Sequence, residues 1–154
     1  MSLGMNTKRR LYRALAVGAV LFIFGNSLLP ARQSHGGSGM VLEFAASVLG
    51  GLGLPFSLSE HLIRKSAHFL EFFLLGVFLT KALGFHNLKV FRSVCLDLSL
   101  CLLVAAADET IQAFVPGRSS KAADVLLDLA GAAAGMLSCM LFSRLLSRAK
   151  RPER

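Results

Sequence analysis

The fold is decided by residues 107–131, which read ADETIQAFVPGRSSKAADVLLDLAG. This stretch gathers polar and charged side chains between two long apolar runs: Asp108, Glu109, Gln112, Arg118, Asp124 and Asp128. The flanking runs, rich in Leu, Val, Ala and Cys, are long enough to cross a bilayer. Charged groups in such surroundings are costly unless they pair or meet water, so their clustering marks the candidate functional site.

The composition indicates a membrane protein. Of the 154 residues, 54% are hydrophobic and only 17% are charged, whereas soluble domains carry about 25% charged residues. Four segments reach membrane length, at residues 11–29, 63–83, 90–108 and 125–143. Each is close to the roughly 20 residues that a helix needs to cross the hydrocarbon layer. We therefore predict an all-α polytopic membrane protein with four transmembrane helices.

A further apolar segment, Met40–Pro55, is too short for a regular span. We predict a short interfacial or re-entrant helix there, between the first and second spans, because a fifth crossing would put the basic tail outside. The predicted organisation is a cytoplasmic N-terminal segment (1–10), a membrane domain (11–143) and a basic cytoplasmic tail (144–154). Cleavage of the first span as a secretory signal is disfavoured, since it is long and lacks a small-x-small site.

The net charge is +8, and the basic residues are distributed as the predicted topology requires. Most basic residues fall in three segments that share one side of a four-span protein: Lys8, Arg9, Arg10 and Arg13; Lys81, Lys89 and Arg92; Arg144, Arg148, Lys150, Arg151 and Arg154. The positive-inside rule therefore places both termini in the cytoplasm and the loop from Asp108 to Asp124 outside. We expect the basic ends to contact anionic membrane lipids, and expect no nucleic-acid partner.

The second span carries Arg64, Lys65, His68 and Glu71 in its outer half. At helical spacing Arg64, His68 and Glu71 share one face, and Lys65 shares an overlapping face with His68. In the third span, Asp97 lies near the membrane midplane, about 16 Å along the helix from Asp108.

The fourth span begins with Asp124 and Asp128 and continues into Gly131-Ala132-Ala133-Ala134-Gly135, a GxxxG pattern that favours tight helix packing within the bundle over dimerisation. Three cysteines lie in the spans without CxxC spacing: Cys95, Cys101 and Cys139. We expect free thiols and no disulfide.

Two motifs carry a family resemblance. Residues 65–75, KSAHFLEFFLL, fit the pattern K-x-x-H-F-x-E-[YF]-x-x-L, and residues 108–118, DETIQAFVPGR, fit D-E-x-x-Q-x-F-x-P-x-R, followed by Asp124 and Gly131. Both resemble the VanZ-like family of bacterial integral membrane proteins, as does FGNS at 24–27, over roughly residues 15–140. The chain departs from the family pattern at Phe72, where Tyr is more usual, and at Asp128, where many members have Asn. Asp97 is not part of the pattern.

The resemblance implies a multi-pass protein of the bacterial cytoplasmic membrane, related to glycopeptide (teicoplanin) resistance by an unsettled mechanism. It implies the fold and location more directly than an activity, because most members are uncharacterised.

Our leading hypothesis is an outward-facing polar pocket that binds an anionic cell-envelope component, such as a lipid phosphate or a peptidoglycan precursor. Its predicted residues are Arg64, Lys65, His68, Glu71, Asp108, Glu109, Gln112, Arg118, Asp124 and Asp128. Arg118, which follows Pro116-Gly117, would offer a planar guanidinium to carboxylate or phosphate.

Three alternatives stay open. The first is a membrane-embedded enzyme acting on a lipid-linked envelope substrate, with Asp108, Glu109 and His68 as acid–base groups. The second is a structural bundle whose charges only pair internally, and the third is a transporter or proton path through His68, Glu71 and Asp97. We expect no cofactor and assign no metal ligands, although a metal site of His61, His68 and Asp108 is a further alternative.

Overall fold

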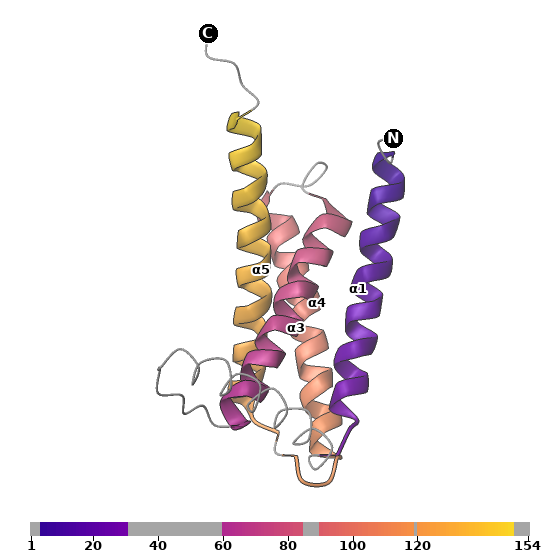
Figure 1. Ribbon diagram of the computed structural model, residues 1–154, viewed down its shortest axis with the longest axis vertical. Coiled ribbons are helices and arrows are strands. Elements are labelled where there is room, and N and C mark those ends of the chain that lie inside the picture. The colour runs from indigo at the N-terminus through magenta and orange to yellow at the C-terminus, as the bar shows by residue number, and fades with distance from the viewer. Residues whose placement is uncertain (1–3, 31–59, 85–89, 119, 150–154) are drawn as a thin grey trace, which may run out of the picture.

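A computed structural model describes residues 4–30, 60–84, 90–118 and 120–149 (Figure 1). The described residues form four helices: α1 (Met5–Ser27), α3 (Glu60–Leu83), α4 (Val90–Ala113) and α5 (Ala122–Ala149). The all-α prediction is confirmed for this part of the chain. The short helix predicted within 40–56 lies outside the described residues.

The four helices form one bundle in which α3 packs against each of the others. The N-terminal end of α1 and the C-terminal end of α5 lie at one end of the bundle, and the connection from α4 to α5 lies at the opposite end (Figure 1). The end with this connection therefore holds the last turns of α1 and α4 and the first turns of α3 and α5. It is called the loop end below.

The observed helices are longer than the predicted spans. The third span was predicted to end at residue 108, but α4 continues to Ala113. It continues because the residues that break a helix come later: Pro116, and Gly117 with its φ of 79°. The extension matters for function because Glu109 and Gln112 stand on a rigid helix instead of a loop.

Glycines allow α3 and α5 to approach closely. A Cβ added at Gly131 would overlap the carbonyl oxygen of Phe69, and one at Gly135 would overlap that of Phe73. On the other helix, a Cβ at Gly76 would overlap the carbonyl oxygen of Ala132. These three positions confirm the prediction that the GxxxG pattern packs within the bundle.

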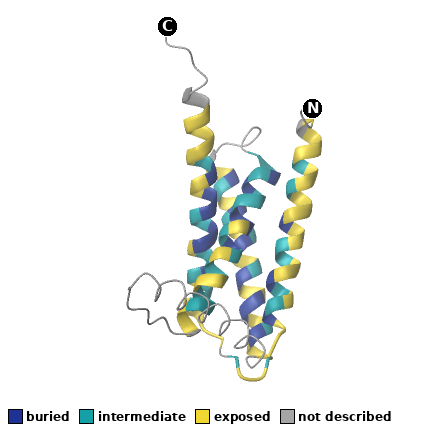
Figure 2. Ribbon diagram, in the orientation of Figure 1, coloured by how far each residue is buried: buried dark blue, intermediate teal, exposed yellow. Residues whose placement is uncertain are grey.

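The buried residues lie on the inward faces of the helices (Figure 2); the interior is partly polar and the exterior is largely apolar. Large apolar side chains are exposed on all four helices, including Leu21, Phe22, Leu70, Leu103 and Leu141. The buried polar residues are Ser27, Thr80, Ser93, Asp97, Asp108, Glu109, Gln112 and Asp128. An apolar exterior over a polar interior suits a lipid environment better than water.

Two of the described helical segments, His61–Leu83 and Ala122–Leu146, are long and apolar enough to cross a membrane by length and composition alone. This supports a membrane protein in general terms. The crossing of the membrane by α1 and α4 is part of the proposal below.

Candidate functional site

The loop end of the bundle gathers the charged and amide residues that the sequence singled out. Eight of them line a single pocket: Arg64, Lys65, His68, Glu109, Gln112, Arg118, Asp124 and Asp128. The other two, Glu71 and Asp108, lie directly against His68. Helices α3, α4 and α5 and the α4–α5 connection thus bring all ten together.

His68 stands between two carboxylates. Its Nδ1 lies 3.8 Å from Oε2 of Glu71, one turn further along α3, and 3.9 Å from Oδ2 of Asp108 on α4. The Asp108 side chain is fully buried. Buried carboxylates beside a half-buried imidazole are costly unless a proton, a cation or hydrogen-bond donors compensate them.

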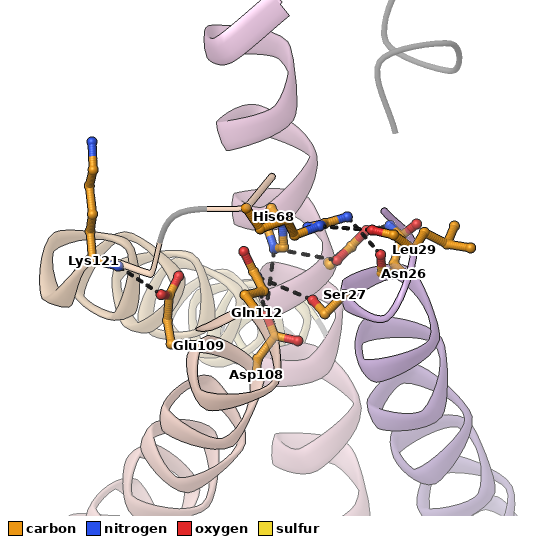
Figure 3. Close-up of polar contacts among 10 residues, drawn as sticks. Asn26, Ser27, Leu29, His68, Asp108, Glu109, Gln112 and Lys121 are labelled. Atoms are coloured by element: carbon orange, nitrogen blue, oxygen red, sulfur yellow. Dashed lines mark hydrogen bonds and ion pairs between the residues drawn. The ribbon is translucent and has the colours of Figure 1, made fainter. Parts of the chain in front are cut away.

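Helix α1 supplies part of that compensation. The amide of Asn26 donates to Oε1 of Glu71 at 2.7 Å. The amide of Gln112 donates to Oδ2 of Asp108 at 2.8 Å and to Oγ of Ser27 at 3.2 Å. Figure 3 shows Asn26 and Ser27 of α1, His68 of α3, and Asp108 and Gln112 of α4 converging. The carboxylates of Glu71 and Asp108 are thereby held in fixed orientations.

Asn26 and Ser27 were missed as site residues by the sequence reasoning, which noted them only as part of the family resemblance. The signal that points to them is their place in the FGNS element at 24–27. Ser27 is fully buried, so the C-terminal end of α1 is a wall of the site.

Arg118 is positioned by a tight turn. The N–H of Arg118 donates to the carbonyl of Val115 at 3.2 Å, and Pro116 with positive-φ Gly117 suits the two central positions of a type II turn. The guanidinium then reaches α1, where Nε donates to Leu29 O at 3.0 Å and Nη2 donates to Asn26 O at 2.8 Å. Arg118 therefore closes the C-terminal end of α1, whose last carbonyls have no partner within the helix.

Burial, ahead of repulsion from Arg64, lowers the pKa of the Arg118 guanidinium. The group nevertheless stays charged at physiological pH, because an arginine does not lose its proton in proteins. The sequence-based picture of Arg118 as a free fork for a ligand is thus modified. Two of its N–H groups are already used, and the remainder of the guanidinium lines the pocket.

Two further contacts fix the start of α5. Oε2 of Glu109 accepts a hydrogen bond from the backbone N–H of Lys121 at 2.8 Å, just before α5 begins. A carboxylate at this position also interacts favourably with the helix dipole. Nζ of Lys65 on α3 lies 2.6 Å from Oδ1 of Asp124 in the first turn of α5.

The pocket between these groups is narrow. Its volume of about 20 Å³ leaves room for roughly one water molecule or ion. His61 and Leu127 complete the lining, and Arg64 Nη2 lies 3.3 Å from Nδ1 of His61. Within the described residues, Arg64 forms no ion pair with a carboxylate.

Asp97 does not belong to the pocket. Its Oδ2 accepts a hydrogen bond from the Thr80 hydroxyl at 3.0 Å, and the carboxyl group is buried between α3 and α4. The proton path through His68, Glu71 and Asp97 therefore stays an alternative, without a hydrogen bond from Asp97 to either of the other two in the described part of the chain.

One set of side chains in the site could hold a metal ion. His68, Asp108 and Asp128 each offer a ligand atom, and these atoms lie within 4.8 Å of one another. The set differs from the one considered from the sequence, since Asp128 on α5 takes the place of His61.

Comparison with known proteins gives one match. The family model described as VanZ/LLP1 matches residues 12–143, which bears out the resemblance carried by the two motifs. Neither the curated proteins nor the solved structures contain a match.

Proposed function

Because the chain belongs to the VanZ-like family, we propose that it is a four-span protein of the bacterial cytoplasmic membrane whose polar pocket faces outward. In this proposal the pocket binds an anionic component of the cell envelope through a phosphate or carboxylate group. The topology and the ligand are supported by different observations.

The topology is supported by the surfaces of α1 and α4. Leu15, Val17 and Phe22 on α1 and Phe91 and Leu103 on α4 are exposed, which is favourable in lipid and costly in water. The 24 residues of α4 extend about 36 Å at 1.5 Å per residue, enough to span the hydrocarbon layer. The start of α1 and the end of α5 lie at the end opposite the pocket, and basic residues are concentrated in these segments, so the positive-inside rule turns the pocket outward.

The single observation that carries the proposal of anion binding is the unpaired charge of Arg64 within the described residues. Its guanidinium lines the pocket together with Lys65 and Arg118, and it lacks a carboxylate partner among the described residues. Lys65 is paired with Asp124, and Arg118 is bound to backbone carbonyls. Arg64 therefore has donors available in the planar arrangement that binds phosphate or carboxylate with two hydrogen bonds.

An apolar groove favours a ligand that carries a lipid chain. It lies between α1 and α3, is lined by Leu15, Phe22, Leu74 and Phe78 among others, and has a volume of about 320 Å³. Glu71, which contacts His68, forms its polar end. An acyl or prenyl chain in the groove would place its head group beside the site.

Binding of a lipid phosphate to the purified protein tests the proposal. We expect short-chain phosphatidic acid to raise the melting temperature of the wild type, and uncharged diacylglycerol of the same chain length to do so less. Arg64→Ala should weaken phosphatidic acid binding by about tenfold or more, the cost of one charge-assisted contact. Lys81→Ala is the matched control, since Lys81 is a cation in the last turn of the same helix. Equal affinity in the two variants would contradict the proposal.

The relation to glycopeptide resistance is proposed on family membership alone. In a host that lacks its own VanZ-like protein, expression of the wild-type chain should raise the teicoplanin concentration needed to stop growth. Arg64→Ala, expressed at the same level, should not. A wild-type chain without effect would remove resistance from the proposed function.

A membrane-embedded enzyme is the second candidate, and the position of His68 favours it. An imidazole between two carboxylates, with Nδ1 3.8 and 3.9 Å from their oxygens, can serve as a general acid or base. Turnover of a lipid-linked phosphate by wild-type protein, lost in His68→Gln, would establish the enzyme. If the lipid-linked phosphate binds and is recovered chemically unchanged, the enzyme is excluded for this ligand and binding alone is supported.

A purely structural bundle explains only part of the contacts. It explains the ion pair of Lys65 with Asp124 and the hydrogen bond of Asn26 with Glu71. It leaves Arg64 without a carboxylate partner in the described ranges.

A further inference from the structure

The geometry points to a divalent metal site at the floor of the pocket, and we propose that His68, Asp108 and Asp128 bind one first-row transition-metal ion such as Zn²⁺. The three ligands come from α3, α4 and α5 respectively. The site would therefore connect three helices through one ion. The inference does not require the anion-binding function, although it bears on the same pocket.

The ligand atoms are close to the spacing that an ion imposes. Atoms bound to one ion at about 2.0–2.2 Å lie about 3–4 Å apart. Nδ1 of His68 and Oδ2 of Asp108 are already 3.9 Å apart. The full set lies within 4.8 Å, so a side-chain adjustment of less than about 1 Å would close the site.

Three buried polar atoms of the proposed ligands have no hydrogen-bond partner in the described part of the chain. Nδ1 of His68, Oδ1 of Asp108 and Oδ1 of Asp128 are buried and have no hydrogen-bond partner. Asp108 and Asp128 are 0% and 2% exposed. Buried polar atoms are nearly always satisfied in folded proteins, so the three unpartnered atoms on neighbouring side chains are consistent with a bound cation.

The charge balance leads to the same conclusion. Among the described side chains, the carboxylates that line the pocket or lie against His68 are Glu71, Asp108, Glu109, Asp124 and Asp128, and the cations that line it are Arg64, Lys65 and Arg118. The Lys121 side chain extends away from this group (Figure 3). With all five carboxylates ionised, as metal binding requires of the ligands, and with His68 neutral, this set carries two more negative than positive charges, which is the charge of one divalent ion.

A neighbouring side chain supports the proposed ligands. Gln112 donates to Oδ2 of Asp108 and to Ser27, which orients Asp108 in the way that outer-shell partners orient metal ligands. The imidazole in the set favours zinc or another transition metal over magnesium or calcium, whose ligands are mostly oxygen atoms. The pocket volume of about 20 Å³ is sufficient for one ion.

A bound ion would also reconcile the acid excess with an anionic ligand. His68 and Asp128 line the pocket beside Arg64, so a metal ion held by them would present positive charge to a phosphate. In the absence of the ion, the carboxylates would repel the same group.

The experiment uses the full chain, purified in detergent, stripped with EDTA and equilibrated with Zn²⁺, Mn²⁺ or Mg²⁺. We expect about one Zn²⁺ per wild-type chain by equilibrium dialysis and elemental analysis, and weak binding of Mg²⁺. His68→Ala and Asp128→Asn should each lower Zn²⁺ affinity by at least about 100-fold, since loss of an outer-shell partner alone costs about 10–100-fold. Asp97→Asn is the matched control, since Asp97 is a buried carboxyl group outside the pocket, and it should bind as the wild type does.

Three results would overturn the inference. They are a wild-type chain that binds no transition metal, an affinity that His68→Ala and Asp128→Asn leave unchanged, and a preference for Mg²⁺ over Zn²⁺. If a variant fails to fold, the absorption spectrum of the Co²⁺-loaded wild type tests the proposed ligands instead. It should show ligand-field absorption without the charge-transfer band of a thiolate, whereas a thiolate band would assign the metal to Cys95, Cys101 or Cys139 and contradict the proposed ligands.

Failure of this inference is distinguishable from failure of the proposed function. Arg64→Ala should keep its metal and bind phosphatidic acid about tenfold or more weakly. Metal binding without any anion binding would contradict the proposed function alone, and equal phosphatidic acid binding with and without metal would contradict the metal's contribution to it.

Discussion

The ammonium of Lys65 lies 2.6 Å from the carboxylate of Asp124, and this ion pair joins α3 to the first turn of α5 at the edge of the pocket. The side chains are 31% and 22% exposed, so solvent screens the pair in part. Exposed pairs contribute about 0.2–1 kcal/mol, and this pair should contribute near the upper end.

The double-mutant cycle of Lys65→Ala and Asp124→Ala measures that contribution. We expect a coupling of about 1 kcal/mol in the free energy of unfolding. The charge-reversed protein, Lys65→Asp with Asp124→Lys, should recover part of the stability that either reversal loses alone. Strict additivity of the two alanine substitutions would show that the pair contributes nothing.

Arg118→Lys should destabilise the protein although it keeps the charge. A lysine ammonium lacks the planar arrangement of donors that reaches both Asn26 O and Leu29 O. Loss of one or two hydrogen bonds from a charged group costs about 1.5–3 kcal/mol, which thermal unfolding in detergent would detect. Arg64→Lys is the control, because Arg64 binds no backbone carbonyl among the described contacts, and its melting temperature should stay near that of the wild type.

Gly131→Ala and Gly135→Ala should each destabilise the bundle by about 1–3 kcal/mol, the usual cost of overpacking. The added Cβ would meet backbone carbonyls of Phe69 and Phe73, and backbone cannot rotate away as a side chain can. Gly18→Ala on α1 is the matched control, since nothing lies within 4 Å of its Cβ position. It should leave stability unchanged or raise it slightly, because alanine favours the helix.

Asp97→Asn should be tolerated, and Thr80→Val should not. The Thr80 hydroxyl is the donor to Asp97, and no cation pairs with this carboxyl group within the described ranges. Asparagine removes a buried charge and keeps an oxygen that accepts the bond. Valine leaves the carboxyl group without its donor, at a cost of about 1–3 kcal/mol. Strong destabilisation by Asp97→Asn would instead indicate an ion pair.

The orientation in the membrane can be tested with single cysteines after replacement of Cys95, Cys101 and Cys139. Ser120→Cys in the α4–α5 connection should react with a membrane-impermeant maleimide in intact spheroplasts. Lys8→Cys, exposed near the opposite end, should react only after permeabilisation. Labelling in the reverse order would place the pocket on the cytoplasmic side and contradict the proposed topology.

Much of the fold was predictable because apolar length and small-residue spacing are local properties of a sequence. The runs around 63–83 and 125–143 could be recognised by length, and Gly131 and Gly135 indicated a close helix contact. Helix ends were less predictable. The sequence reasoning ended the third helix at residue 108 because the run of apolar residues stops there, whereas α4 ends near the residues that break it.

The site was predictable in membership but not in pairing. Buried polar residues in apolar helices must meet one another, so clustering of His68, Asp108 and Asp124 could be anticipated. Which side chain meets which depends on helix rotation and on the path of the α4–α5 connection, which no spacing rule supplies. The two hydrogen bonds of Arg118 to the end of α1 were therefore not predicted, and Asp128 was not considered as a metal ligand.

The bond between Arg118 and the carbonyl of Leu29 has a consequence for how the protein is made. Its two partners are 89 residues apart, an interval that a ribosome translates in roughly 5–20 s. Throughout that time the newly made first helix must keep its terminal carbonyls hydrated or in contact with lipid head groups. Assembly of the loop end is thus complete only when the hairpin of α4 and α5 has been made.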